Sequence, residues 1–169
     1  MNSKGHMNEI TTSEEFTRDW DWYACDQEGH IGHFTTAGLR CLPKAVKEDR
    51  AAAERVVNFF LNDASETGNF IVRPGVETDA GGWDKPGARD RYLKSFAEMA
   101  RKGMFSYNTQ MIHGSRGGYY LVAIPQHPMH IADLPLEIAR LVRRVRAPLL
   151  FANTDHIAEA DTLLWERPE

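Results

Sequence analysis

The sequence has little of what marks secreted, metal-stapled or membrane-bound proteins. It contains two cysteines, Cys25 and Cys41, whose spacing matches neither a disulfide framework nor a paired zinc-ligand motif. No apolar run approaches the roughly 18 residues that a membrane span needs, and the start of the chain lacks the basic-then-apolar order of an export signal. We therefore expect a reduced, cytoplasmic protein with no membrane segment, no structural metal and no cofactor.

Positive charge is scarce as well. The 169 residues carry 20 basic and 24 acidic side chains, which gives a formal net charge of −4. A protein that binds nucleic acid by neutralising phosphates needs a basic field, so the composition argues against a nucleic-acid binder. An acidic protein is better suited to a basic protein partner.

The length and composition predict a single globular domain. Hydrophobic residues make up 42% of the chain, which is enough for a core, and a second domain would have too little interior to stand alone. Residues 1–6 precede a second methionine, Met7, and Gly5-His6-Met7 matches the junction left by many cleaved tags. We interpret residues 1–6 as a cloning remnant and assign the domain to residues 7–169.

Two hairpins are predicted from the distribution of β-leaning runs and turn residues. In residues 20–38 two such runs flank the tight turn Asp26-Gln27-Glu28-Gly29. Residues 105–112 and 119–124 flank a second, glycine-rich reversal. Shorter strands are expected at residues 69–73 and 149–152.

Three helices are predicted from apolar residues recurring at three- and four-residue steps. They cover residues 44–62, 88–102 and 134–146, and Asp133 is placed to cap the last of them. Residues 75–87 contain several glycines and prolines and are expected to form a long loop. Hairpins without regular strand–helix alternation favour an α+β fold, with about three helices packed on a mainly antiparallel sheet.

The histidines leave an enzymatic alternative open. His30, His33 and His113 could join Cys25 or Asp26 around a transition metal. Residues three apart on a strand point to opposite faces, however, so only one of His30 and His33 could reach a shared ion without a bulge. The sequence therefore predicts no metal site and assigns no catalytic residue. The enzymatic alternative is a small hydrolase or metal-dependent enzyme that uses His33, His113 and nearby carboxylates.

The N-terminal region combines acidic and aromatic residues. Between Met7 and Glu28 seven carboxylates stand against one base, Arg18, and Phe16, Trp20, Trp22 and Tyr23 lie among them. Such a mixture is typical of a surface where aromatic residues anchor a cationic partner and carboxylates speed its approach. It also fits aromatic residues that form the core beneath a solvated acidic face. The candidate partner-binding residues are Glu14, Glu15, Asp19, Trp20 and Asp21.

Residues 21–38, DWYACDQEGHIGHFTTAG, resemble the opening of small bacterial immunity proteins that accompany polymorphic toxins. In that family a Trp-aromatic-Ala strand, an Asp-x-x-Gly turn and an apolar-x-x-Phe-Thr-Thr run begin the domain. The resemblance covers only this segment, which holds no catalytic motif. It implies a cytoplasmic protein, acting without a cofactor, that binds and neutralises a cognate toxin by direct protein–protein contact.

Overall fold

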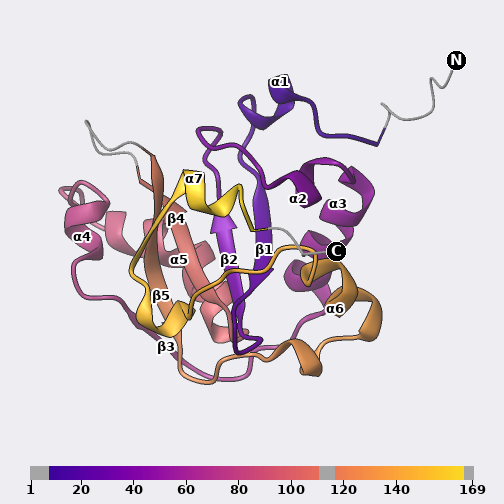
Figure 1. Cartoon of the computed structure of the whole chain (residues 1–169). Coiled ribbons are helices and arrows are strands. Elements are labelled where there is room, and N and C mark those ends of the chain that lie inside the picture. Colours follow the sequence, from indigo (N-terminus) through magenta and orange to yellow (C-terminus); the bar gives the residue numbers. More distant parts are fainter. Residues whose placement is uncertain (1–7, 111–116, 166–169) are drawn as a thin grey trace, which may run out of the picture.

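The computed structural model describes residues 8–110 and 117–165, so the segment 1–6 interpreted as a cloning remnant lies outside the described residues. The described chain forms one six-stranded sheet in the order β1-β2-β4-β5-β3, with β6 also paired to β5 (Figure 1). Its pairs are antiparallel except for the parallel pair β2–β4. The strands are β1 (Asp21–Cys25), β2 (Ile31–Thr35), β3 (Phe70–Val72), β4 (Phe105–Thr109), β5 (Gly118–Pro125) and β6 (His156–Ala158).

The predicted mixed fold with a mostly antiparallel sheet is confirmed, but the described residues hold more helices than the three expected. They are α1 (Thr12–Glu15), α2 (Lys44–Lys47), α3 (Arg50–Asn58), α4 (Val76–Asp79), α5 (Ala88–Arg101), α6 (Leu136–Val142) and α7 (Glu159–Thr162). A π-helical turn, Phe59–Asp63, and two 3-10 turns, Ile131–Asp133 and Phe151–Asn153, complete them. No helix in the described part of the chain is long and apolar enough to cross a membrane.

Both predicted hairpins are confirmed. Strands β1 and β2 pair with Trp22 opposite Phe34, and β4 pairs with β5. The Asp26 carboxylate accepts hydrogen bonds from the backbone N–H groups of Glu28 and His30, at 3.0 and 2.9 Å, and so closes the predicted turn. Residues 111–116, which include His113 and most of the second reversal, lie outside the described residues.

The helix predicted over residues 44–62 is wrong as a single element. Asp49 interrupts it, because its side chain accepts a hydrogen bond from Ala52 N at 3.0 Å and caps the start of α3. This helical segment then ends in the π-helical turn. There the Lys102 ammonium donates to the carbonyls of Phe60 and Leu61 at 2.7 and 3.0 Å. The helix predicted over residues 88–102 is confirmed by α5.

Two predictions nearer the C-terminus need correction. The helix expected over residues 134–146 is shorter, since α6 starts only after Pro135 and Asp133 belongs to the preceding 3-10 turn. The strand expected at residues 149–152 is a 3-10 turn instead. Asp26 accepts from Phe151 N at 3.1 Å and the Tyr107 hydroxyl donates to Thr154 O at 2.7 Å, so tertiary hydrogen bonds override a local strand pattern.

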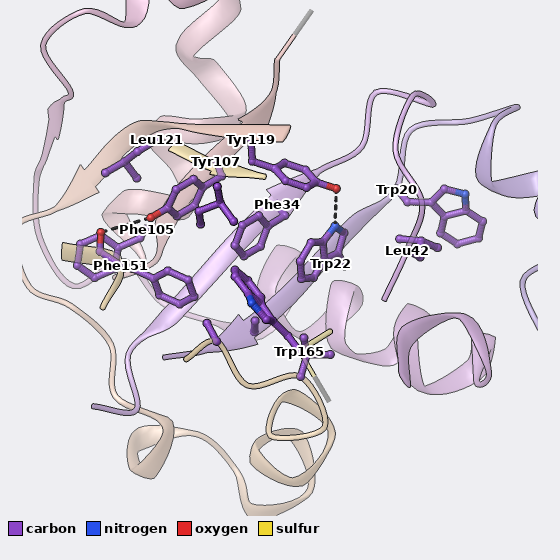
Figure 2. Close-up of a cluster of buried hydrophobic side chains, with 14 of the residues drawn as sticks. Trp20, Trp22, Phe34, Leu42, Phe105, Tyr107, Tyr119, Leu121, Phe151 and Trp165 are labelled. Atoms are coloured by element: carbon purple, nitrogen blue, oxygen red, sulfur yellow. Dashed lines mark hydrogen bonds between the residues drawn. The ribbon is translucent and has the colours of Figure 1, made fainter. Parts of the chain in front are cut away.

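The two faces of the sheet are covered differently. On one face Trp22 stacks on Phe34 with ring centroids 4.2 Å apart, and the C-terminal segment adds Phe151 and Trp165 (Figure 2). That segment, orange to yellow in Figure 1, crosses in front of the sheet while α5 lies behind it. Helices α3, α5 and α6 supply the packing on the other face, against Tyr23 and its neighbours.

Candidate partner-binding surface

The first two candidate acids, Glu14 and Glu15, interact with their own chain. Glu14 closes a capping box on α1, because its carboxylate accepts from Thr11 N at 2.9 Å while Thr11 Oγ1 accepts from Glu14 N. It also pairs with the guanidinium of Arg50. The hydrogen bond from the Thr11 backbone, followed by the bond from Arg50, lowers the pKa of Glu14 from 4.5 to about 2.

Glu15 is buried, with 1% of its surface exposed. Its carboxylate accepts a hydrogen bond from the backbone N–H of Leu42 at 2.9 Å and pairs with the Lys47 ammonium at 2.8 Å. The two oxygens therefore hold α1 against the end of α2 and against the residue that precedes its N-cap. This position leaves Glu15 almost no surface to offer a partner.

Asp19 supports a tight turn in the loop that follows β2. Ala37 and Gly38 have φ values of 49° and 67°, and Leu39 N donates to Thr36 O at 2.9 Å, as in a type I′ turn. A positive φ is unfavourable for alanine, and the Asp19 carboxylate accepts from Ala37 N at 2.7 Å. Burial raises the pKa of Asp19, the bond from Ala37 opposes this, and the charge of Asp21 adds to it.

Trp20 is buried at the margin of the aromatic cluster (Figure 2), and its indole N–H donates to Glu14 O at 2.9 Å. The guanidinium carbon of Arg18 lies 3.5 Å from the centroid of its ring. Arg18 itself is about half exposed and makes a 3.7 Å ion pair with Glu54 of α3. The face of the Trp20 ring beneath the guanidinium is therefore covered by the long, half-exposed side chain of Arg18 and not by residues of the core.

A groove of about 250 Å³ separates this segment from α3, and we call it the acidic groove. Three carboxylates line it, those of Asp19, Asp21 and Glu54, together with the Asn58 amide. Its full lining is Arg18, Asp19, Trp20, Asp21, Ala53, Glu54, Val57 and Asn58. The structure therefore brings Asp19, Trp20 and Asp21 together with residues of α3, while Glu14 and Glu15 lie outside the groove.

Asp21 also connects the groove with a buried polar chain on the sheet. Its Oδ1 lies 2.9 Å from His33 Nε2, and His33 Nδ1 lies 2.7 Å from Ser106 Oγ. These residues stand side by side on β1, β2 and β4, because His33 faces Ser106 in the parallel register. His33 and Ser106 are 2% and 0% exposed, so of these three hydrogen-bonded side chains only Asp21 is in contact with solvent.

Two apolar side chains in the neighbouring chain segments are exposed. Phe16 and Leu39 are 47% and 45% exposed, whereas the other three aromatic residues of the acidic segment, Trp20, Trp22 and Tyr23, are buried. Gly38 packs closely on this segment, since a Cβ at that position would lie 3.7 Å from Phe16 O. The turn that precedes Leu39 therefore contacts the backbone that follows α1.

The residues considered for a metal site and the glycine-rich loop show no ligand-binding arrangement in the described part of the chain. Among the described residues no group of three or more histidine, cysteine or acidic side chains could hold a metal ion, and His113 lies outside that part of the chain. The predicted loop over residues 75–87 contains α4. The N–H groups of Gly81 and Gly82 donate to Thr78 O and Glu77 O, so they end this helix and do not point at a ligand.

Comparison with known proteins supplies no relative: no protein-family model, no curated protein and no solved structure matches the chain. The resemblance of residues 21–38 to immunity proteins therefore stays a prediction.

Sequence reasoning missed the contribution of α3 to the groove. Glu54 and Asn58 lie four residues apart on the exposed side of that helix, which the sequence shows only as an ordinary polar helix face. Their position opposite Asp19 and Asp21 depends on how α3 packs beside β1.

Proposed function

We propose that this chain is an immunity-type inhibitor, a cytoplasmic protein that binds and neutralises a cognate bacterial toxin by direct protein–protein contact. The observation that carries the proposal is the acidic groove, together with the exposed side chains of Phe16, which precedes Arg18 in the chain, and Leu39, which follows the turn that Asp19 holds. Protein interfaces concentrate affinity in a few apolar or aromatic anchors, and charges at their rim steer the partner's approach. The resemblance of residues 21–38 to immunity proteins gives the partner class.

The charge of the groove favours a basic surface on the toxin. Three carboxylates against one guanidinium leave an excess of negative charge that a cationic partner would compensate. Phe16 and Leu39 would then bury their exposed area against apolar groups of the same partner. This division predicts that the acids act mainly on the association rate and the apolar residues mainly on the dissociation rate.

The test is binding and inhibition with the toxin domain encoded by the reading frame next to this gene. We expect a 1:1 complex by calorimetry and loss of the toxin's activity when the complex forms. The double variant Phe16→Ser/Leu39→Ser should dissociate at least tenfold faster, and Leu136→Ser, at an exposed leucine of α6, is the matched control. A toxin domain that neither binds nor is inhibited overturns the proposal.

The second candidate is the hydrolase alternative, and the chain Ser106–His33–Asp21 favours it. A hydroxyl, an imidazole and a carboxylate in hydrogen-bond order are the parts of a nucleophilic triad. A nucleophile must also meet its substrate, and Ser106 is completely buried. Labelling with a fluorophosphonate probe separates the two candidates: stoichiometric modification that is lost in Ser106→Ala would support the hydrolase.

A further inference from the structure

We propose that the acidic groove is an arginine-binding site, in which an arginine of the partner replaces Arg18 on the ring of Trp20. This inference rests on the proposed function and deepens it, because it names the side chain that the toxin would present. The site is lined by Trp20, by the acidic residues Asp19, Asp21 and Glu54, and by Arg18 itself.

The chain itself shows that the groove accepts a guanidinium. Arg18 lies over the indole at 3.5 Å and reaches Glu54 at 3.7 Å, which are the two contacts that a guanidinium makes best, a stack on an aromatic face and an ion pair. Both residues line the groove, so removing Arg18 would uncover the face of the Trp20 ring that the guanidinium now covers. The groove therefore already binds an arginine side chain, which belongs to the protein itself.

Arg18 is held weakly enough to be exchanged. Its side chain and that of Glu54 are 53% and 52% exposed, and exposed ion pairs at such a distance contribute little. It makes no other hydrogen bond or ion pair with the described residues. A partner's arginine, already oriented by the surrounding interface, would make the same contacts while Arg18 turns into solvent.

The carboxylates provide more charge than Arg18 neutralises. Asp21 Oδ1 lies 2.9 Å from His33 Nε2, and Asp19 accepts from backbone N–H groups of Ala37 and Thr36, so neither carboxylate pairs with an arginine or lysine of the described residues. An incoming guanidinium can donate from several N–H groups in one plane, whereas a lysine ammonium cannot stack in this way. The site should consequently prefer arginine to lysine.

The experiment follows the Trp20 indole N–H by ¹H–¹⁵N NMR while N-acetyl-arginine-methylamide is added. We expect a saturable shift of this signal and a clearly smaller one with the lysine analogue. The affinity for the arginine probe should rise at least twofold in Arg18→Ala, because no side chain then covers the Trp20 ring. It should fall at least threefold in Glu54→Gln. Arg55→Ala is the matched control, because Arg55 lies on the same helix, is 56% exposed and pairs with Glu137 outside the groove.

A second variant protects the test against loss of folding in Arg18→Ala. Arg18→Lys keeps the positive charge but cannot stack as a plane, and it should also bind the arginine probe more tightly than wild type. Equal probe affinity in wild type, Arg18→Ala and Arg18→Lys, or equal shifts with arginine and lysine, overturns the inference. A toxin that binds with unchanged affinity to Glu54→Gln would overturn the arginine site yet leave the proposed function standing.

Discussion

The two halves of the acidic N-terminal segment use the same residue types in opposite ways. In residues 11–16 the carboxylates bind groups of their own chain: Glu14 caps α1 and pairs with Arg50, and Glu15 is buried against Leu42 and Lys47. Residues 18–21 lead into β1 and place Asp19 and Asp21 along a groove open to solvent. Charge density alone therefore does not separate structural carboxylates from those available to another protein. The role of each carboxylate depends on which groups of its own chain bind its oxygens.

The aromatic residues of the two halves show the opposite contrast in exposure. In the first half Phe16 is 47% exposed, whereas in the second Trp20 is buried beneath Arg18. A partner would therefore meet an apolar group beside α1 and charged groups at the groove. Substitutions that separate stability from binding can test this contrast, beginning with the residue most deeply involved in the fold.

Replacing Glu15 by alanine should have the largest effect. It would leave the buried N–H of Leu42 without an acceptor and Lys47 without its ion-pair partner, so we expect the free energy of unfolding to fall by about 2–3 kcal/mol. Urea denaturation measures the change. Glu48→Ala, which removes an exposed carboxylate paired with Lys44, is the control and should stay within about 0.5 kcal/mol of wild type. A loss no greater than that of the control would show that Glu15 is a surface residue.

Replacing Glu14 by glutamine should have a smaller effect that depends on pH. Because the pKa of Glu14 is lowered from 4.5 to about 2, its ionised form stabilises the fold above pH 4.5, and this contribution disappears as the pH falls toward 2. Glu14→Gln should therefore be less stable than wild type at pH 7 and equal to it near pH 2. Thermal unfolding across this range checks the prediction. Parallel curves would contradict it.

Much of the fold could be predicted because its signals are local. The Asp26–Gly29 turn and the helix α5 follow from adjacent residues, and both are confirmed. The misassigned elements are those fixed by distant partners. Phe151 forms a 3-10 turn because Asp26 and the aromatic cluster hold it, and Asp133 does not cap α6 because Pro135 sets the start of that helix. No pattern within these segments indicates such contacts.

The candidate site was accessible to sequence reasoning only in part. Asp19, Trp20 and Asp21 do line the groove, since they lie in one extended run where composition was the signal. Glu15 could not be recognised as buried, because its partners Leu42 and Lys47 are far along the chain. Burial of a carboxylate depends on such tertiary partners, which the sequence around it does not reveal.

Ala37→Gly should raise stability by a modest amount. The φ of 49° at Ala37 is unfavourable for any residue with a Cβ, and glycine removes this penalty at some cost in unfolded-chain entropy, so we expect a gain of about 0.5–1 kcal/mol. The same exchange at Ala51, exposed in α3, should lower stability because glycine disfavours helix. A loss in both variants, measured by urea denaturation, would mean that the turn needs the alanine side chain.

Asp19→Asn should change stability least, and with the pH dependence opposite to that of Glu14. Burial raises the pKa of Asp19 above 3.8, so the folded state holds this proton more tightly than the unfolded state. Stability from this group is therefore gained as the pH falls toward 3.8 and lost as it rises through the raised value. Asparagine keeps an oxygen that can accept from Ala37 N and carries no charge.

At pH 7 we expect the Asp19→Asn variant to lie within about 0.5 kcal/mol of wild type, on the stable side, with the difference shrinking toward pH 4. Urea titrations between pH 4 and 7 measure this difference. A loss of more than about 1 kcal/mol at pH 7 would show that the turn requires the charged carboxylate. Asp19 would then belong with Glu14 and Glu15 as a structural acid, and the two halves of the segment would no longer differ.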